Sequence, residues 1–205
     1  MNAFEQCCQV ESLAMEKLLP FIKSRSQDGR FVLTNKGNQS RELQKSVGDL
    51  LFNDGKTGAV WTVEIKSEYT KRPNLFLETW SNRSRFTPGW MFTLANVDLL
   101  FYYFIESSDL YIMRFDKLRR WSFGGNGTPG NIYTYEEKQQ RKYNQMNDTC
   151  GRCVPIDIIR KSVGFVYRNL DDTANLSQIS PASVPPSDIP FATNLFPLKE
   201  EWVPV

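Results

Sequence analysis

Residues 46–52 and 59–68 both have the alternating apolar and polar pattern of β-strands, and a turn sequence separates them. That turn is Asn53-Asp54-Gly55-Lys56-Thr57-Gly58, in which glycine, asparagine and aspartate favour a reversal of the chain. If Asn53 faces Val60, the two segments form an antiparallel hairpin with one entirely apolar face. A slip of one residue would move every apolar side chain to the other face, so this pattern predicts a single register. The predicted apolar face consists of Leu50, Phe52, Trp61, Val63 and Ile65.

The remaining pattern predicts an α/β (α+β) domain in which helices and strands surround a mixed sheet with an antiparallel beginning. A helix is expected over residues 3–23, where apolar residues recur at helical spacing. Residues 135–146 are polar and charged enough to form an exposed helix or a lid. Asp116 is a good N-cap for a later helix. Further strands are expected over 30–34, 74–80, 98–105 and 109–115, and short helices over 88–95, 116–121 and 155–162.

The chain of 205 residues fits one domain over residues 1–170, followed by a tail over residues 171–205. The tail is rich in serine and proline, which is typical of a segment without its own core. Its apolar residues suggest docking on the domain or on a partner. Because no apolar run reaches the length of a membrane span and no signal peptide is recognised, we expect a cytoplasmic protein, in the host cytoplasm if a phage encodes it.

The chain has no histidine. Its absence excludes Ser-His-Asp and Cys-His nucleophilic pairs, HEXXH zinc sites and His-Asn-His nucleases. An enzyme of this composition must therefore use carboxylates, lysines, cysteines or tyrosines. The net charge is only +2, so any surface that binds nucleic acid must be local.

The four cysteines occur as Cys7-Cys8 and as the pair Cys150 and Cys153. The second pair has CXXC spacing, which suits half of a zinc site, with the N-terminal pair supplying the other half. Adjacent residues on a helix point about 100° apart, however, so Cys7 and Cys8 cannot easily share one ion. We therefore expect buried or loop thiols rather than zinc ligands.

The polar face of the predicted hairpin places Asp49 directly across from Glu64, with Lys66 two residues further along the same strand. Two directly opposed carboxylates destabilise each other unless a counter-charge is present. A divalent cation, Mg²⁺ or Mn²⁺, supplies such a charge, and Mg²⁺ prefers carboxylate, water and phosphate oxygens. It polarises a scissile phosphate, while a neighbouring lysine orients or deprotonates the attacking water. The alternative is a solvated strand edge, because Glu-X-Lys alternation is common on exposed strands.

The segments Lys45–Phe52 and Val63–Glu68 resemble the GD…(D/E)XK signature of the PD-(D/E)XK, or restriction-endonuclease-like, nuclease superfamily. Residues 74–82 and 89–100 resemble its small phage-type and uncharacterised members. The similarity covers about residues 3–120, and Gly-Asp stands where the name-giving motif has Pro-Asp. It implies an αβββαβ core with a central mixed sheet, here with additional C-terminal helices, together with a divalent metal and phosphodiester cleavage.

The strand pattern also assigns roles to individual residues. Lys66 is expected to assist the attacking water. Glu78 lies on the face of the fourth strand away from Leu75 and Leu77 and is a further catalytic candidate, as an additional metal ligand, with a charged edge residue as the alternative. Many members carry a first-helix glutamate at the site; Glu16 is the better candidate and Glu11 the other, although a solvated helix face suits both. The expected metal ligands are Asp49, Glu64 and Ile65.

Phosphate contacts are expected from basic loop residues, with solvated loops as the alternative. Aromatic residues interleave with them, which suits backbone contact combined with base stacking. The basic candidates are Lys36, Arg41, Lys45, Lys71, Arg72, Arg83 and Arg85, and the aromatic ones are Tyr69, Trp80, Phe86 and Trp90.

The sequence therefore predicts a metal-dependent nuclease with nucleic acid, and DNA in particular, as its partner. A homodimer is compatible with this prediction, and no membrane partner is expected. One alternative is an RNA nuclease. Another is an inactive nuclease-fold binding protein, for example a phage-encoded protein that acts on a host factor; the presence of Asp49, Glu64 and Lys66 together argues against it.

Overall fold

The computed structural model describes residues 3–34, 47–54, 58–94, 96–125, 128–142 and 145–172, and the statements below concern these ranges. The fold is α+β with a central mixed sheet, as the sequence predicts, and this sheet has six strands. None of the helices in the described ranges has the length and apolar character that a membrane span requires. The helices are α1 (Ala3–Arg25), α3 (Trp90–Thr93), α4 (Phe115–Phe123), the 3-10 helix η1 (Asn131–Thr134) and α5 (Ile156–Ser162).

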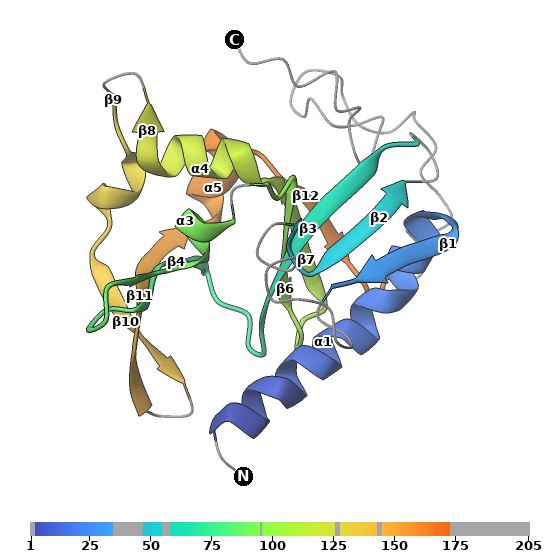
Figure 1. Ribbon diagram of the computed structural model, residues 1–205, viewed down its shortest axis with the longest axis horizontal. Helices are drawn as coiled ribbons and strands as arrows, with labels where there is room; N and C mark the ends of the chain where they lie inside the picture. Colours follow the sequence, from blue (N-terminus) through green and yellow to red (C-terminus); the bar gives the residue numbers. More distant parts are fainter. Residues whose placement is uncertain are drawn as a thin grey trace.

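The main sheet has the strand order β1-β2-β3-β6-β7-β12 (Figure 1). Its first three strands form an antiparallel meander, β6 joins β3 in parallel, and β7 and β12 continue in antiparallel pairs. β12 was not predicted, because four residues carry too little periodicity to be distinguished from a loop. The strands are β1 (Ser26–Leu33), β2 (Leu50–Asp54), β3 (Val60–Glu68), β6 (Leu99–Phe104), β7 (Asp109–Arg114) and β12 (Val166–Asn169).

A second sheet of four strands, in the order β10-β11-β4-β5, lies to the left of the main sheet in Figure 1. The exposed helix that was one expectation for residues 135–146 is wrong, because β10 and β11 pair there as an antiparallel hairpin. β10 is an edge strand, so it needs little apolar sequence. The strands are β4 (Asn74–Asn82), β5 (Thr87–Pro88), β10 (Glu137–Lys142) and β11 (Gln145–Pro155); β8 (Gly124–Gly125) and β9 (Thr128–Pro129) form a separate ribbon.

Each face of the main sheet carries its own hydrophobic core. On one face, α1 packs Leu18 and Phe21 against the apolar side of β2 and β3 and against Phe101 of β6. On the other face, Leu100 and Tyr102 of β6 pack with β4, α3 and α4. Successive side chains of a strand point to opposite faces. Every second residue of β3 therefore faces the second sheet rather than α1.

Several predicted boundaries differ from the observed ones, and two of these differences have a clear local cause. β2 begins at Leu50 rather than at residue 46, because Gly48 has a left-handed backbone (φ +77°) that interrupts the strand. α4 begins at Phe115 with Arg114 as its N-cap, and Asp116 lies in its first turn, where a carboxylate still favours the helix dipole. Apart from its first two residues, the predicted tail lies outside the described residues.

Candidate functional site

The β2–β3 hairpin has the predicted register. Leu50, Trp61 and Val63 are completely buried, and Ile65 packs against the same core at its margin. Glu64 and Lys66 therefore lie on the opposite face of β3, as predicted. The facing pairs are Leu50–Val63, Leu51–Thr62, Phe52–Trp61 and Asn53–Val60.

Asp49 lies just before the start of β2 and contacts β3 through both its backbone and its side chain. Its N–H donates to the carbonyl of Val63 at 2.8 Å. Its carboxylate Oδ2 accepts the N–H of Ile65 at 2.9 Å. The Asp49 side chain thus binds the edge of β3 at Ile65, between Glu64 and Lys66. A further residue of β2 would otherwise pair with β3 at this place.

Gly48 allows this close approach. A Cβ at this position would lie 2.5 Å from the Val63 carbonyl oxygen, closer than real side chains come. The carbonyl of Gly48 also accepts a hydrogen bond from the hydroxyl of Thr34. The Gly-Asp sequence therefore has a local reason: glycine brings the chain against β3, and the next residue reaches the edge of that strand.

Glu64 and Lys66 form a close ion pair, with 2.5 Å between Glu64 Oε1 and Lys66 Nζ. The Glu64 side chain is only 7% exposed and that of Lys66 is 32% exposed. Burial raises the pKa of Glu64 to about 7; Lys66 opposes this shift, while the charge of Asp49 and a hydrogen bond with it add to it. Near neutral pH the Glu64 carboxylate therefore exchanges a proton easily.

The pKa of Lys66 is raised. Burial alone would lower it, but the combined charges of Glu64, Asp49 and Glu78 outweigh that effect. The ammonium group also lies 5.6 Å from the centre of the Trp90 ring, which is a favourable cation–π distance. Lys66 is therefore positively charged at neutral pH, with three carboxylates acting on it.

Glu78 and Trp90 come from the part of the molecule that faces β3. Glu78 belongs to β4 of the second sheet, and Trp90 is the first residue of α3. The two elements touch closely, because a Cβ at Gly89 would lie 2.8 Å from Glu78 Cγ. The site is thus assembled from both sheets, with Asp49, Glu64 and Lys66 on one side and Glu78 and Trp90 on the other.

Oxygen atoms suited to a hard cation are present beside the start of β2. The N–H and C=O of a strand residue point to the same side, so the carbonyl of Ile65 faces the side from which Asp49 binds its N–H. Burial is the main cause of the raised pKa of Glu64, and the charge of the neighbouring Asp49 carboxylate adds to it, so the two carboxylates resist joint ionisation. Within the described ranges, no three Asp, Glu or Cys side chains form a metal-binding group. Two carboxylates and one carbonyl suit Mg²⁺, which usually keeps several water ligands.

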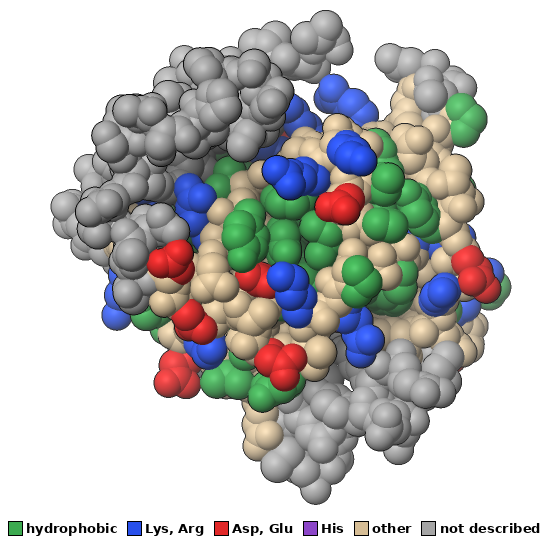
Figure 2. Space-filling view, turned by 180° about the vertical axis from the view of Figure 1, so that it is seen from behind, with side chains coloured by type: hydrophobic (Ala, Val, Ile, Leu, Met, Phe, Trp, Pro, Cys, Tyr) green, Lys and Arg blue, Asp and Glu red, His purple; other side chains and the backbone are tan. Residues whose placement is uncertain are grey.

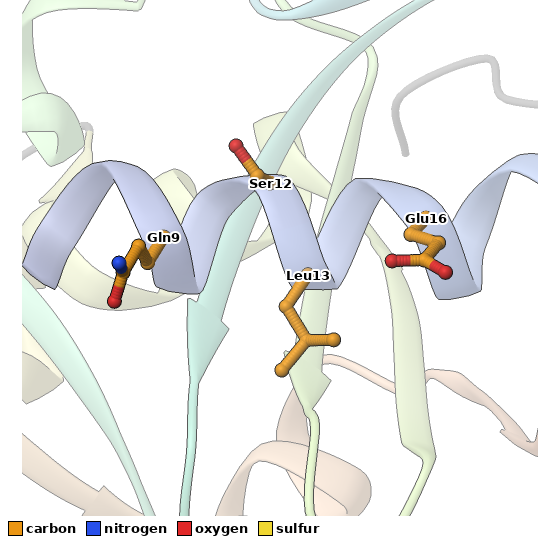
Figure 3. Close-up of a pocket in the computed structure, with 4 residues that line it drawn as sticks. All are labelled: Gln9, Ser12, Leu13 and Glu16. Carbon is orange, nitrogen blue, oxygen red and sulfur yellow. The ribbon is translucent and has the colours of Figure 1, made fainter.

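The structure does not bring Glu16 or Glu11 to this site. Both are exposed on α1, which packs on the face of the main sheet opposite to Glu64. Glu16 is two residues from both Ala14 and Leu18, which face the core, and two residues correspond to about 200° around a helix. In Figure 3, Glu16 helps to line a surface pocket of α1; the four lining residues are Gln9, Ser12, Leu13 and Glu16.

Three of the basic candidates make ion pairs with neighbouring carboxylates. Side chains of both signs are interspersed on the face that Figure 2 shows, as the small net charge suggests. Arg85 is exposed, and its backbone N–H donates to Asn82 Oδ1. Lys36, Arg41 and Lys45 lie outside the described residues. The ion pairs are Lys71–Asp109 at 2.6 Å, Arg72–Glu68 at 3.9 Å and Arg83–Glu137 at 3.2 Å.

Cys150 and Cys153 are free thiols in β11, where they face Trp80 and Phe76 of β4 across the strand pair. Burial is the largest cause of the raised pKa of both thiols. The side chains of Cys7 and Cys8 lie outside the described residues.

Trp90 has a different role from the one its sequence context suggests. It was a candidate for base stacking, but it is 7% exposed and packs on Phe115 with 5.9 Å between the ring centres. Its contact with Lys66 was missed in the sequence because the two residues are far apart in the chain. What the sequence does predict locally is the short helix over residues 88–95, which contains Trp90.

Neither protein-family models, nor curated proteins, nor solved structures give a match to this chain. A function for it therefore has to be argued from the geometry of the site.

Proposed function

We propose that this chain is a metal-dependent nuclease of the PD-(D/E)XK type that hydrolyses phosphodiester bonds in DNA. The observation that carries the proposal is the arrangement around residues 64–66 of β3. The Asp49 carboxylate accepts the N–H of Ile65 at 2.9 Å, and Lys66 Nζ lies 2.5 Å from Glu64 Oε1. Two carboxylates and an ammonium group, without histidine, are sufficient for metal-assisted phosphodiester hydrolysis.

The order of elements supports the proposed core. A long helix is followed by three antiparallel strands, a short helix and a strand parallel to the third one. This is the αβββαβ order expected for the superfamily, with β4 and β5 inserted before the short helix. The three proposed catalytic residues lie on or beside its second and third strands.

Asp49, Glu64 and the carbonyl of Ile65 are the proposed metal ligands. A divalent cation bound by them supplies a Lewis acid for the scissile phosphate and lowers the pKa of a water ligand. Glu64 has to lose its proton before it can bind a cation, and its pKa is raised to about 7. Protons and metal therefore compete for this carboxylate, and metal affinity should increase as the pH rises through neutrality.

Lys66 has a separate task in the proposed reaction. Because its pKa is raised, it holds its proton at neutral pH and acts as a cation rather than as a base. An ammonium group beside the phosphate stabilises the negative charge that develops on the phosphate oxygens in the transition state. Glu78, which acts on Lys66 by charge, and Trp90, which contacts it, hold that group in place.

The proposal is tested by incubating the purified protein with single-stranded, duplex and branched DNA and with RNA, each with Mg²⁺ and with Mn²⁺. We expect cleavage of at least one DNA substrate and its loss when a chelator is added. Asp49→Asn protein, purified in the same way, controls for contaminating nuclease. Metal binding should also raise the midpoint of thermal unfolding, by mass action. No cleavage of any substrate, together with an unchanged unfolding midpoint, would contradict the proposal.

A further inference from the structure

The turn between β4 and β5, residues 80–88, is held in one conformation by many hydrogen bonds; we call it the stacking hairpin. The two strands pair at Trp80 with Pro88 and at Asn82 with Thr87. Within the turn, Asn82 Oδ1 accepts the N–H of Arg85 at 2.9 Å, and the carbonyl of Arg83 accepts the N–H of Phe86 at 3.2 Å. The N–H of Arg83 donates to the carbonyl of Asp148, which anchors the turn to β11.

The stacking hairpin displays an aromatic ring at its tip. Phe86 is 72% exposed, the highest exposure among the large apolar residues that the structure describes. Its backbone has φ +51°, which is a strained conformation for a bulky residue. Its ring contacts that of Trp80 in an edge-to-face arrangement, with 6.2 Å between the ring centres. The turn therefore keeps a rigid phenyl ring in water in spite of two unfavourable terms, backbone strain and apolar exposure.

Two arginine side chains of the stacking hairpin, Arg83 and Arg85, lie close to Phe86 in the sequence. The Arg83 guanidinium lies 5.0 Å from the centre of the Trp80 ring and pairs with Glu137, so it supports the aromatic pair from the side of β10. Arg85, immediately before Phe86, is exposed. An exposed ring can stack on the flat face of a base, and an exposed cation beside it can bind the phosphate of the same nucleotide.

The stacking hairpin extends directly from the proposed catalytic centre. Trp80 and Glu78 are two residues apart on β4, which corresponds to about 7 Å along the strand. The charge of Glu78 acts on Lys66. A strand of nucleic acid with one base on Phe86 therefore needs to extend only a short way along β4 to reach the site.

We propose that the stacking hairpin binds an unpaired base of single-stranded DNA, with the base on Phe86 and the adjoining phosphate beside Arg85. The inference rests on the proposed function in one respect, namely that the bound strand is the one that is cut. In a duplex, neighbouring base pairs cover the faces of each base. The stacking hairpin therefore makes the enzyme prefer single strands, frayed ends or flaps to blunt duplex DNA.

The test is fluorescence anisotropy of a labelled oligothymidylate of about 15 nucleotides, near the upper end of single-strand site sizes, and of a blunt duplex of equal length. Both are titrated in the presence of a chelator, so that cleavage does not occur. Phe86→Gly removes the ring and suits a positive φ, so the variant should remain folded. Stacking on one aromatic residue corresponds to a loss of roughly 5-fold to 150-fold in affinity for the single strand.

Two variants serve as controls. Phe86→Tyr keeps a ring at the same place and should bind the single strand like the original protein. Tyr133→Ala removes another aromatic residue, 58% exposed in η1, and should leave binding unchanged. An unchanged affinity in Phe86→Gly, an equal loss in Tyr133→Ala, or equal affinity for the blunt duplex would each overturn the inference.

This experiment separates the two proposals. If the single strand binds and Phe86→Gly weakens it, but no substrate is cut with metal, the nuclease proposal fails and the binding site stands. If DNA is cut with metal but Phe86→Gly binds the single strand normally, the stacking hairpin has no such role and the nuclease proposal stands.

Discussion

At Glu64 the environment opposes the charge that metal binding requires. The side chain is nearly buried and lies beside Asp49, so its ionised form is unfavourable, and Lys66 compensates for only part of this cost. Buried charged groups that are retained in this way are frequent at functional sites, where the shift in pKa is part of the chemistry. Glu64 therefore links protein stability to pH in a measurable way.

The first prediction concerns this linkage. The pKa of Glu64 is 4.5 without the fold and about 7 within it, so between these values the folded protein holds more protons than the unfolded chain. The free energy of unfolding should then fall as the pH rises from 4.5 to 7, by about 3 kcal/mol in total from this group. Urea unfolding of Glu64→Gln at several pH values should lack this decrease. Glu106→Gln, at an exposed position, should keep it, and equal pH dependence in both variants would contradict the assignment.

The second prediction concerns Gly48 and uses Gly58 as a matched control. Both have a positive φ, +77° and +70°, so alanine at either position costs about 1–2 kcal/mol in backbone strain. Only at Gly48 does the new Cβ collide with backbone, 2.5 Å from the Val63 oxygen, whereas Gly58 faces open space. Gly48→Ala should therefore lose about 1–3 kcal/mol more than Gly58→Ala in urea unfolding. It should also displace Asp49 and lower nuclease activity; equal losses in the two variants would show that Gly48 is not tightly packed.

At the scale of elements, the hairpin that carries the site could be predicted because its apolar face permits only one register. The same reasoning placed α1, β4, β6, β7 and α5 near their observed positions. It failed at β10, where an edge strand of charged residues has no apolar face to reveal its period. It also could not assign β4 to a second sheet, because strand pairing depends on long-range contacts with β11 that local patterns do not contain.

The site was predictable to the extent that it depends on that hairpin. Glu64 and Lys66 follow from the alternation of β3, and Asp49 follows from the register. Asp49 nevertheless precedes the paired residues of β2, and it contacts β3 through one backbone and one side-chain hydrogen bond. Trp90 could not be predicted, since it approaches Lys66 from another element. For Glu16, helical spacing alone did not show which face of α1 packs on the sheet.

The third prediction concerns the attachment of α1 to the hairpin. Arg25, in the last turn of α1, lies 3.6 Å from the carboxylate of Asp54 at the end of β2, and the Asp54 side chain is completely buried. Removing one partner of a buried pair is strongly destabilising, by about 3–5 kcal/mol, because a buried charge is left without compensation. Arg25→Met should therefore lower the free energy of unfolding by that order. Lys23→Met, an exposed neighbour in the same turn, should change it by less than about 0.5 kcal/mol, and similar values for both would refute the assignment.

At the scale of the whole molecule, the site depends on how the second sheet is held against the main one. The hydroxyl of Tyr102 in β6 accepts the N–H of Phe76 in β4 at 3.0 Å and donates to Glu68 in β3. Asp98 accepts hydrogen bonds from the N–H and hydroxyl of Thr62, which joins the beginnings of β3 and β6 as a structural residue. The hydrogen bond between Tyr102 and Phe76 joins the two sheets and thereby helps to position Glu78 and the stacking hairpin relative to Lys66.

The most direct test of the proposed nuclease function is single-turnover cleavage of a DNA substrate, with saturating Mg²⁺ or Mn²⁺, by three variants of β3. Glu64→Gln should abolish cleavage, because a neutral amide replaces an anionic ligand of a hard cation. Lys66→Ala should retain metal-induced stabilisation but cut about 10²–10³ times more slowly, since its proposed role is confined to the transition state. Glu68→Gln removes a carboxylate charge on the same strand and face, outside the proposed centre. It keeps an oxygen that can accept the hydrogen bond of the Tyr102 hydroxyl, so this variant should cut normally. Full activity in Glu64→Gln, in a preparation whose Asp49→Asn counterpart is inactive, would contradict the central claim.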